Sequence, residues 1–232
     1  MMSSKMNIAV IVAGGTGSRF GEKNPKQFFK VNGKQIIEYS INAFSSLEII
    51  DKIVVVCHES FIKQMGKMFE ANAKVSIIVG GKTRFHSSFN ALKFIKKNEW
   101  INSNVLIHDA ARPLISEEVI QNCIVELKKH PAITASMPVI ETISVTSNNF
   151  IKAIPKRETL FTNQTPQCFW FDVIYESYKK AESKAENECF TDDVSVAIQR
   201  GIGIKVVQGS AMNIKITTKD DIIKMKSLMV KS

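Results

Sequence analysis

The stretch NIAVIVA (residues 7–13), followed at once by GGTGSRFG (residues 14–21), decides the fold of this chain. Six of its first seven residues are apolar and none is charged, as expected of a strand that is buried on both faces of a sheet. A glycine-rich turn directly after such a strand is typical of sheets that hold a ligand at their strand ends. We therefore predict an α/β protein that begins with this strand.

Apolar runs rich in Val and Ile alternate with segments of helical periodicity along most of the chain. The expected strands cover residues 52–57, 74–79, 104–108, 132–137 and 204–208. The expected helices cover residues 36–47, 61–69, 88–97, 172–183 and 192–200, with two more that begin at Ser116 and Thr218. This alternation predicts a Rossmann-like, three-layer α/β fold with a mostly parallel sheet between helices. Because ligands bind at the carboxyl ends of such strands, the residues after each strand are the candidates for a site.

The pattern breaks between residues 139 and 169. Two short β-like pieces, residues 142–146 and 150–154, flank the turn signal Ser147-Asn148-Asn149. A long stretch without a core pattern inside a compact domain is commonly functional or used in association. We therefore expect an extended β-arm over about residues 139–169, within a single domain of residues 1–232.

The composition limits the kind of partner. The 232 residues carry 31 Lys and Arg against 22 Asp and Glu, a formal charge of 31 − 22 = +9. The basic residues are dispersed, so the surplus indicates either a solvated surface or a site for a small polyanion, and no nucleic-acid module is visible. No apolar run approaches the ~20 residues of a membrane-spanning helix, so we expect a cytoplasmic protein with no membrane partner. The four cysteines lack metal-binding spacing and are interpreted as buried thiols.

The loop after the first strand has the features of a phosphate site. Gly14, Gly15 and Gly17 leave backbone amides accessible to a phosphate, and the cations Arg19 and Lys26 frame the loop. The loop is neither a Walker A motif nor a clear G-x-G-x-x-G fingerprint. We predict a phosphate-binding loop; a plain glycine turn is the alternative.

Two further expected strands end in polar motifs. GGKTRFHSS (residues 80–88) indicates either a second backbone-lined pocket wall or a turn with a serine N-cap. HDAARP (residues 108–113) places Asp109 at the end of a buried strand, where a carboxylate beside a triphosphate is a natural Mg²⁺ ligand. His108 is interpreted as structural.

Two more cations lie late in the chain. Arg157 lies in the expected arm, and Lys215 lies in NIKITT (residues 213–218), which indicates a short apolar strand. An unpaired ammonium there would be costly, so Lys215 either binds a ligand or pairs with a carboxylate from elsewhere in the chain.

Six motifs follow one another in the chain: AGGTGSRFG…PKQF, GG-x-x-R-x-x-S, HDAARP, QTPQ-x-F, TDD and NIKITT. In this combination the chain, from Ile8 to about Met229, resembles the 2-C-methyl-D-erythritol 4-phosphate cytidylyltransferases, a family close to the ribitol-5-phosphate cytidylyltransferases. The resemblance implies transfer of CMP from CTP to a polyol phosphate, with release of pyrophosphate. It also implies a Mg²⁺ requirement and a homodimer in which the arm reaches the partner's site.

The resemblance also assigns roles to individual positions. Nucleotide contacts fall at Ala13, Gly14, Gly15, Thr16, Gly17, Gly81, Arg84 and Ser87. The catalytic groups are the cations Arg19, Lys26 and Lys215, together with Asp109 as the metal ligand. Polyol phosphate contacts fall at Arg112, Thr142, Arg157 and Thr165, of which Thr142 and Arg157 come from the other subunit.

The acceptor alcohol is left open by departures from the family pattern. VAGGTG (residues 12–17) and IPKR (residues 154–157) favour ribitol phosphate, whereas HDAARP and TDD favour methylerythritol phosphate, which we prefer. Two other classes compete. A dinucleotide-dependent dehydrogenase lacks support because the G-x-G-x-x-G spacing is missing, and a non-catalytic nucleotide-binding module would have no reason to keep five inward-facing charges.

Overall fold

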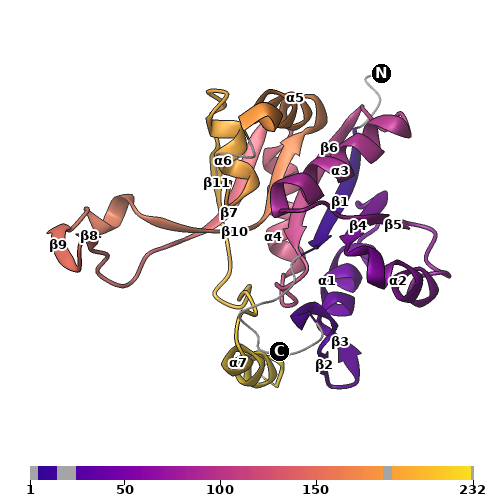
Figure 1. Cartoon of the computed structure of the whole chain (residues 1–232), viewed down its shortest axis with the longest axis horizontal. Coiled ribbons are helices and arrows are strands. Elements are labelled where there is room, and N and C mark those ends of the chain that lie inside the picture. Colours follow the sequence, from indigo (N-terminus) through magenta and orange to yellow (C-terminus); the bar gives the residue numbers. More distant parts are fainter. Residues whose placement is uncertain (1–4, 15–24, 185–189, 231–232) are drawn as a thin grey trace.

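A central sheet organises the molecule in the computed structural model, which describes residues 5–14, 25–184 and 190–230. Within these ranges the sheet has seven strands in the order β11-β7-β10-β6-β1-β4-β5 (Figure 1). Their bounds are β1 (Met6–Ala13), β4 (Lys52–Cys57), β5 (Val75–Val79), β6 (Ser103–Asp109), β7 (Ala132–Pro138), β10 (Phe161–Trp170) and β11 (Lys205–Gln208). β10 runs antiparallel to its neighbours β6 and β7, and the other paired strands of this sheet are parallel.

Helices cover both faces of the sheet. On one face lie α1 (Ile36–Ser45), α2 (Ile62–Met68) and α4 (Glu117–Glu126), and on the other lie α3 (Arg84–Lys97), α5 (Phe171–Ala181) and α6 (Asp193–Ile198). Successive side chains of β1 alternate between the two cores: Ile11 packs with the α1 and α4 residues, and Val10 packs with those of α3 and α5. The predicted three-layer, mostly parallel α/β fold is therefore confirmed.

A small third cluster carries the C-terminal helix. α7 (Lys219–Met229) packs Ile222 and Met225 against the β-hairpin of β2 (Lys30–Val31) and β3 (Lys34–Gln35). The helix begins at the predicted position with a capping box, in which the Asp221 carboxylate accepts the backbone N–H of Thr218 (2.8 Å).

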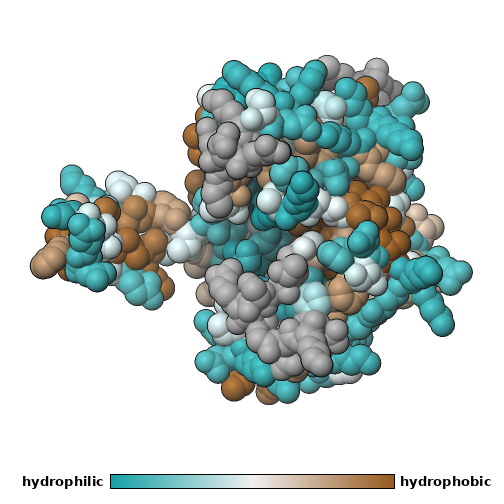
Figure 2. All heavy atoms as spheres, in the orientation of Figure 1, coloured by the Kyte–Doolittle hydropathy of each residue, from teal (hydrophilic) through white to brown (hydrophobic). Residues whose placement is uncertain are grey.

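An arm protrudes from the sheet between β7 and β10, and we use this word for residues 139–160 (Figure 1). It carries the predicted hairpin, formed by β8 (Val145–Ser147) and β9 (Phe150–Ala153), and the hydrogen bond from Val139 N to Leu160 O (3.0 Å) closes its base. Figure 2 shows apolar side chains gathered on the arm. The exposed apolar residues of the arm are Ile140, Ile143, Val145, Phe150, Ile151 and Ile154.

Two boundaries differ from the sequence-based expectation. Residues 161–169, expected in the arm, belong to β10, whose polar first half pairs with β7 and whose second half, from Gln167, lies between β6 and β7. α3 begins at Arg84 rather than at residue 88, because Thr83 is its N-cap and its hydroxyl accepts the backbone N–H of His86 (3.4 Å). The serine N-cap, one of the two alternatives for this motif, is therefore wrong.

Two expectations from composition can be compared with the structure. Cys57, Cys123 and Cys168 are buried free thiols, as predicted, and Cys189 lies outside the described residues. Among the helices that the structure describes, none has the length and apolar character needed to cross a membrane.

Candidate active site

The strand register brings the candidate residues to one edge of the sheet. Val12 pairs with Asp109 across β1 and β6, and Ala13 pairs with Cys57 across β1 and β4. Beyond the strands, Gly80 N donates to Cys57 O (2.8 Å) and Ala110 N donates to Val12 O (3.0 Å). The ends of four parallel strands therefore meet here, as the sequence predicted.

Glycines let the first turn of α3 lie close against the ends of β1 and β5. A Cβ on Gly14 would lie 2.8 Å from Oγ of Ser87, and one on Gly81 would lie 2.3 Å from Cβ of His86. Ser87 is buried and its Oγ accepts the backbone N–H of Gly81 (3.1 Å). Gly14, Gly81 and Ser87 thus form one narrow, backbone-lined wall in which a larger side chain has no room.

Asp109 is the centre of a cluster of charges. Its Oδ1 lies 3.2 Å from Nε of Arg84, and its Oδ2 lies 2.7 Å from Nζ of Lys215 and 3.9 Å from Nε of Arg112. The structure thereby brings together four residues predicted from three separate motifs. It also bears on the open alternative for Lys215, because this lysine pairs with Asp109.

The charges of this cluster shift one another's titration. Burial alone would raise the pKa of Asp109, but the positive charges of Arg84, Lys215 and Arg112 hold it well below its ordinary value. Burial lowers the pKa of Arg112, and the negative charge of Asp109 offsets this decrease only in part. Nε of Arg112 is buried and has no hydrogen-bond partner within the described residues. Three cations gathered around one carboxylate suit a polyanionic phosphate ligand.

The loop that carries Asp109 is held by hydrogen bonds on every side. His108 is fully buried, and its Nε2 lies 3.0 Å from the carbonyl of Arg112 while its Nδ1 lies 3.0 Å from Oγ1 of Thr165. Because a carbonyl only accepts, Nε2 carries the hydrogen and Nδ1 accepts from the Thr165 hydroxyl. That hydroxyl in turn accepts the backbone N–H of Asp109 (3.1 Å). Burial lowers the pKa of His108 to about 4, so the ring is neutral at pH 7.

Thr165 therefore has a place in the scaffold of the site. The residue is buried, with its hydroxyl directed at His108 and Asp109 and its carbonyl accepting from Nδ2 of Asn213 (2.8 Å). Its predicted contact with the polyol phosphate stays a prediction.

The segment around Lys215 is extended backbone rather than the expected strand. It is fixed by Ile216 N, which donates to Ala111 O (2.8 Å), and by Nη1 of Arg112, which donates to Asn213 O (2.8 Å). Asn213 is fully buried. Individual hydrogen bonds from side chains and from single backbone groups therefore hold this segment in place, instead of the regular hydrogen bonds of a sheet.

Lys26 begins a 3₁₀ helix, η2 (Lys26–Phe28), at the same edge. The neighbouring Gln27 is buried and donates from Nε2 to the carbonyl of Ala13 (2.7 Å), which ties this helix to the end of β1. The remaining predicted residues of the first loop, Gly15, Thr16, Gly17 and Arg19, lie outside the described residues.

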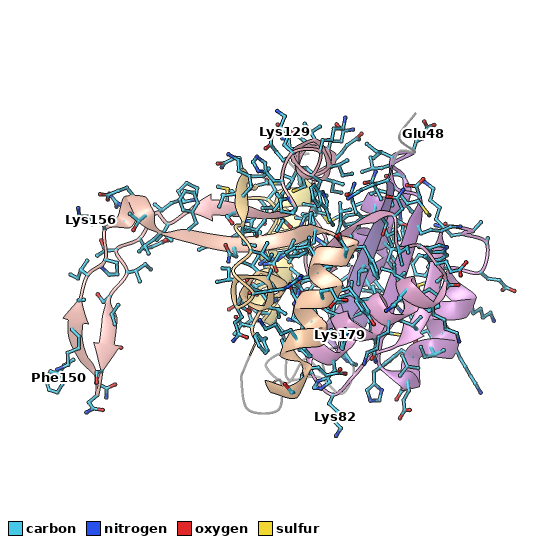
Figure 3. The ribbon with its side chains drawn as sticks, turned by 90° about the horizontal axis from the view of Figure 1, so that it is seen from above. Glu48, Lys82, Lys129, Phe150, Lys156 and Lys179 are labelled. Atoms are coloured by element: carbon cyan, nitrogen blue, oxygen red, sulfur yellow. The ribbon has the colours of Figure 1, made fainter. Side chains whose placement is uncertain are left out.

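Thr142 and Arg157 are not part of this cluster within one chain. Both lie in the arm, where Nη1 of Arg157 donates to the carbonyl of Ile140 (3.0 Å). Figure 3 shows Lys156 and Phe150 on the arm, far to one side of Lys82, which lies between β5 and α3.

Several supporting residues escaped the sequence analysis. Asp193 is fully buried and binds Nη2 of Arg84 (2.6 Å) and the hydroxyl of Tyr178 (2.5 Å). Gln167 is also buried, and its Oε1 accepts the backbone N–H of Asp193 (2.8 Å). The motifs TDD and QTPQ pointed to these stretches, but the individual contacts depend on tertiary structure.

The described side chains of the site could bind a metal ion only together with oxygen atoms of a bound ligand. In the described part of the chain, no three His, Cys, Asp or Glu side chains gather as they would around a metal. Asp109 supplies one carboxylate at the site edge, and Mg²⁺ is often bound by one or two carboxylates with phosphates and water. The residues present therefore fit Mg²⁺ that arrives with a phosphorylated ligand.

A Rossmann-like sheet whose strand ends combine a glycine-lined wall with clustered cations defines an α/β enzyme acting on a nucleotide or another phosphorylated ligand. Comparison with known proteins makes the class specific: the family model for 2-C-methyl-D-erythritol 4-phosphate cytidylyltransferase (IspD) matches residues 7–231. The chain belongs to this family and is a nucleotidyltransferase.

Relatives with this name match along nearly the whole chain. The chain is 40% identical to the 2-C-methyl-D-erythritol 4-phosphate cytidylyltransferase of Thermosipho melanesiensis over 219 residues, which cover 94% of this chain and 95% of the relative. It is also 40% identical to that of Clostridium kluyveri over 225 residues, with 94% of each covered.

Solved structures agree with the fold. The 4-diphosphocytidyl-2C-methyl-D-erythritol synthase of Anaerococcus prevotii has a TM-score of 0.85 at 28% identity, covering 98% of this chain and 97% of the other. The Francisella tularensis 2-C-methyl-D-erythritol 4-phosphate cytidylyltransferase has a TM-score of 0.83 at 29% identity, covering 97% of this chain and 100% of the other.

Proposed function

We propose that this enzyme transfers CMP from CTP to 2-C-methyl-D-erythritol 4-phosphate in a Mg²⁺-dependent reaction that releases pyrophosphate. The observation that carries the proposal is the cluster of Arg84, Arg112 and Lys215 around Asp109, at the edge where the glycine-lined wall ends. The names of its relatives support the acceptor.

The chemistry needs charge neutralisation more than proton transfer. A phosphate oxygen of the acceptor forms a bond to the α-phosphorus of CTP, and the bond from that phosphorus to the bridging oxygen breaks as pyrophosphate leaves. The acceptor is already an anion, so no general base is required, and the barrier comes from bringing two anions together.

Each residue of the cluster then has a defined task. Lys215 and Lys26 bind the triphosphate and stabilise the charge that develops on the leaving pyrophosphate, and Arg112 adds a further positive charge beside Asp109. Asp109 would hold Mg²⁺, which supplies Lewis-acid neutralisation of the phosphate oxygens when bound. The wall of Gly14, Gly81 and Ser87 would hold the nucleoside. Arg19 stays a prediction from the first-loop motif.

A pyrophosphate-release assay tests this function. The full-length protein is incubated with CTP and Mg²⁺ and with either methylerythritol phosphate or ribitol 5-phosphate, and kcat/KM is compared. We expect turnover that chelation with EDTA abolishes, with the higher kcat/KM for methylerythritol phosphate. A higher kcat/KM for ribitol 5-phosphate would overturn the acceptor, and turnover with neither would overturn the proposal.

We further propose that the arm completes the site of a second copy of the chain. Phe150 and Ile140 are 71% and 78% exposed, and an apolar arm of this kind is unfavourable in water unless it is covered. Thr142 and Arg157 lie on this arm, away from Asp109 of their own chain, so they can contact an acceptor phosphate only in a partner.

Mixing two inactive variants tests the shared site. Arg157→Ala and Lys215→Ala should each be inactive alone, and subunits exchanged between them should recover about one quarter of the wild-type sites, because half of the dimers are mixed and each has one intact site. Light scattering should give the mass of a dimer. A monomeric mass, or no recovery after confirmed subunit exchange, would contradict the arrangement.

A further inference from the structure

Asp193 lies behind the site, at the first turn of α6, and is wholly buried. Its Oδ1 accepts a hydrogen bond from the hydroxyl of Tyr178 (2.5 Å), and its Oδ2 accepts one from Nη2 of Arg84 (2.6 Å). A buried carboxylate is costly unless it is paired and hydrogen-bonded, and Arg84 supplies the opposite charge.

The position of Asp193 is also fixed through its backbone. Oε1 of Gln167 accepts the N–H groups of Asp193 (2.8 Å) and Val194 (3.0 Å). Gln167 is in β10, in the middle of the sheet, and is itself buried. The backbone that carries this carboxylate is therefore tied to an interior strand of the sheet.

Arg84 connects this buried carboxylate to the site. The same guanidinium that binds Asp193 through Nη2 binds Oδ1 of Asp109 through Nε (3.2 Å), and its side chain is only 22% exposed. A guanidinium is planar and rigid, so two attached carboxylates fix its orientation completely.

The two oxygens of Asp109 consequently differ. Oδ1 is held from the interior by Arg84, whereas Oδ2 faces Lys215, whose side chain is 41% exposed and can move away. Oδ2 is thus the oxygen that an arriving cation can reach.

We propose that Asp193 is a positioning residue of the enzyme: through Arg84 it fixes the carboxylate of Asp109 so that Oδ2 faces the metal and the nucleotide phosphates. The inference rests on the proposed function, since it requires that Asp109 binds the metal–nucleotide complex. It also gives Arg84 a different task from the contact with the nucleoside that the motif predicted.

The test is a double-mutant cycle on the full-length protein that uses Mn²⁺ as the probe. Asp193→Asn keeps the shape and the hydrogen bond to Tyr178 but removes the charge that faces Arg84. Binding of Mn²⁺ in the presence of CTP is followed by the loss of the free-Mn²⁺ electron paramagnetic resonance signal. Substitution of groups that orient a metal ligand typically costs about 10- to 100-fold in metal affinity or activity, and we expect a loss of this size.

The cycle separates positioning from mere stability. In Arg84→Gln protein, the further change Asp193→Asn should alter Mn²⁺ binding by less than about threefold, because the residue through which Asp193 acts is already gone. Asp172→Asn, which removes an exposed charge on α5, is the matched control and should bind as the wild type does. Equal losses in both backgrounds would overturn the proposal, as would a lower melting temperature with unchanged Mn²⁺ binding.

A second variant decides the question if Asp193→Asn does not fold. Tyr178→Phe removes the hydroxyl that donates to Asp193 and should weaken Mn²⁺ binding by about three- to tenfold. This loss should be seen only in protein that retains Arg84. Unchanged Mn²⁺ binding in that protein would overturn the proposal. Wild-type turnover is measured in parallel. A protein that shows the Mn²⁺ cycle but no pyrophosphate release would refute the proposed reaction alone, and wild-type protein that binds no Mn²⁺ with CTP would refute both.

Discussion

Lys215→Met should separate catalysis from stability. Nζ of Lys215 lies 2.7 Å from Oδ2 of Asp109, and its side chain is 41% exposed. Methionine keeps most of the apolar stem and removes only the ammonium. Asp109 retains Arg84 and Arg112, so the carboxylate is not left without a positive neighbour.

The structure sets the size of both effects. An ion pair that is this accessible to water contributes about 0–1 kcal/mol, so the melting temperature should fall by no more than about 4 °C in a chain of this length. Removing one preorganised charge that stabilises the transition state costs roughly 10²- to 10³-fold in kcat. We therefore expect a folded protein with almost no turnover.

Arg84→Met is the matched comparison. It leaves the fully buried Asp193 without its cation, which costs about 3–5 kcal/mol, or roughly 6 to 20 °C in melting temperature. Pyrophosphate release and thermal unfolding are measured on both variants. The reasoning is refuted if Lys215→Met keeps more than a tenth of the wild-type kcat, or if it melts as early as Arg84→Met.

Three further predictions follow from single positions. Gly81→Ala places a Cβ 2.3 Å from Cβ of His86 and should cost about 1–3 kcal/mol of unfolding free energy in urea titrations, whereas Gly203→Ala, with open space around it, should not. The pKa of His108 is about 4 in the folded protein, whereas that of an unfolded histidine is near 6.5. The free energy of unfolding should therefore fall by up to about 1.4 kcal/mol per pH unit as the pH drops from about 6.5 to 4. A His108→Gln protein that keeps this slope would contradict the assignment of the low pKa to His108. Partial burial alone would raise the pKa of Asp221, but hydrogen bonds from neighbouring hydroxyl and amide groups lower it to about 2. Its stabilisation is therefore present above about pH 4 and is lost as the pH falls through about 2. Asp221→Ala should cost about 1 kcal/mol at pH 7 and clearly less at pH 2 in thermal melts.

The parts of the fold that could be predicted are those encoded locally. β1 and β4 are continuous apolar runs, and the helix caps at Ser116 and Thr218 are side chains that act within four residues. β10 could not be predicted, because TNQTPQ (residues 162–167) is polar and its place in the sheet depends on pairing with the distant strand β7 and, from Gln167, with β6. Lys215 was expected in a strand for the converse reason: its apolar neighbour Ile216 packs against α7 rather than in a sheet.

The residues of the candidate site also fall into those that the sequence predicted and those that only the structure shows. Asp109 and Lys215 were found because charged residues at or near strand ends are visible in the sequence, and the structure brings their side chains into contact. Asp193 and Asn213 were missed because an acidic or amide side chain at the start of a helix or in a loop is ordinary, and their burial depends on residues more than 40 positions away. Arg84 was found, but its pairing with Asp109 and with the buried Asp193 was not.

The cations around Asp109 have a consequence for how the enzyme must be handled. Arg84, Arg112 and Lys215 face two carboxylates, Asp109 and Asp193, so the positive charges among these five described residues exceed the negative ones by 3 − 2 = +1. Such a surplus does not distinguish a substrate from any other multivalent anion of similar size. Phosphate and sulfate buffers should therefore inhibit in competition with CTP, and accumulating pyrophosphate should slow the reaction unless a pyrophosphatase removes it.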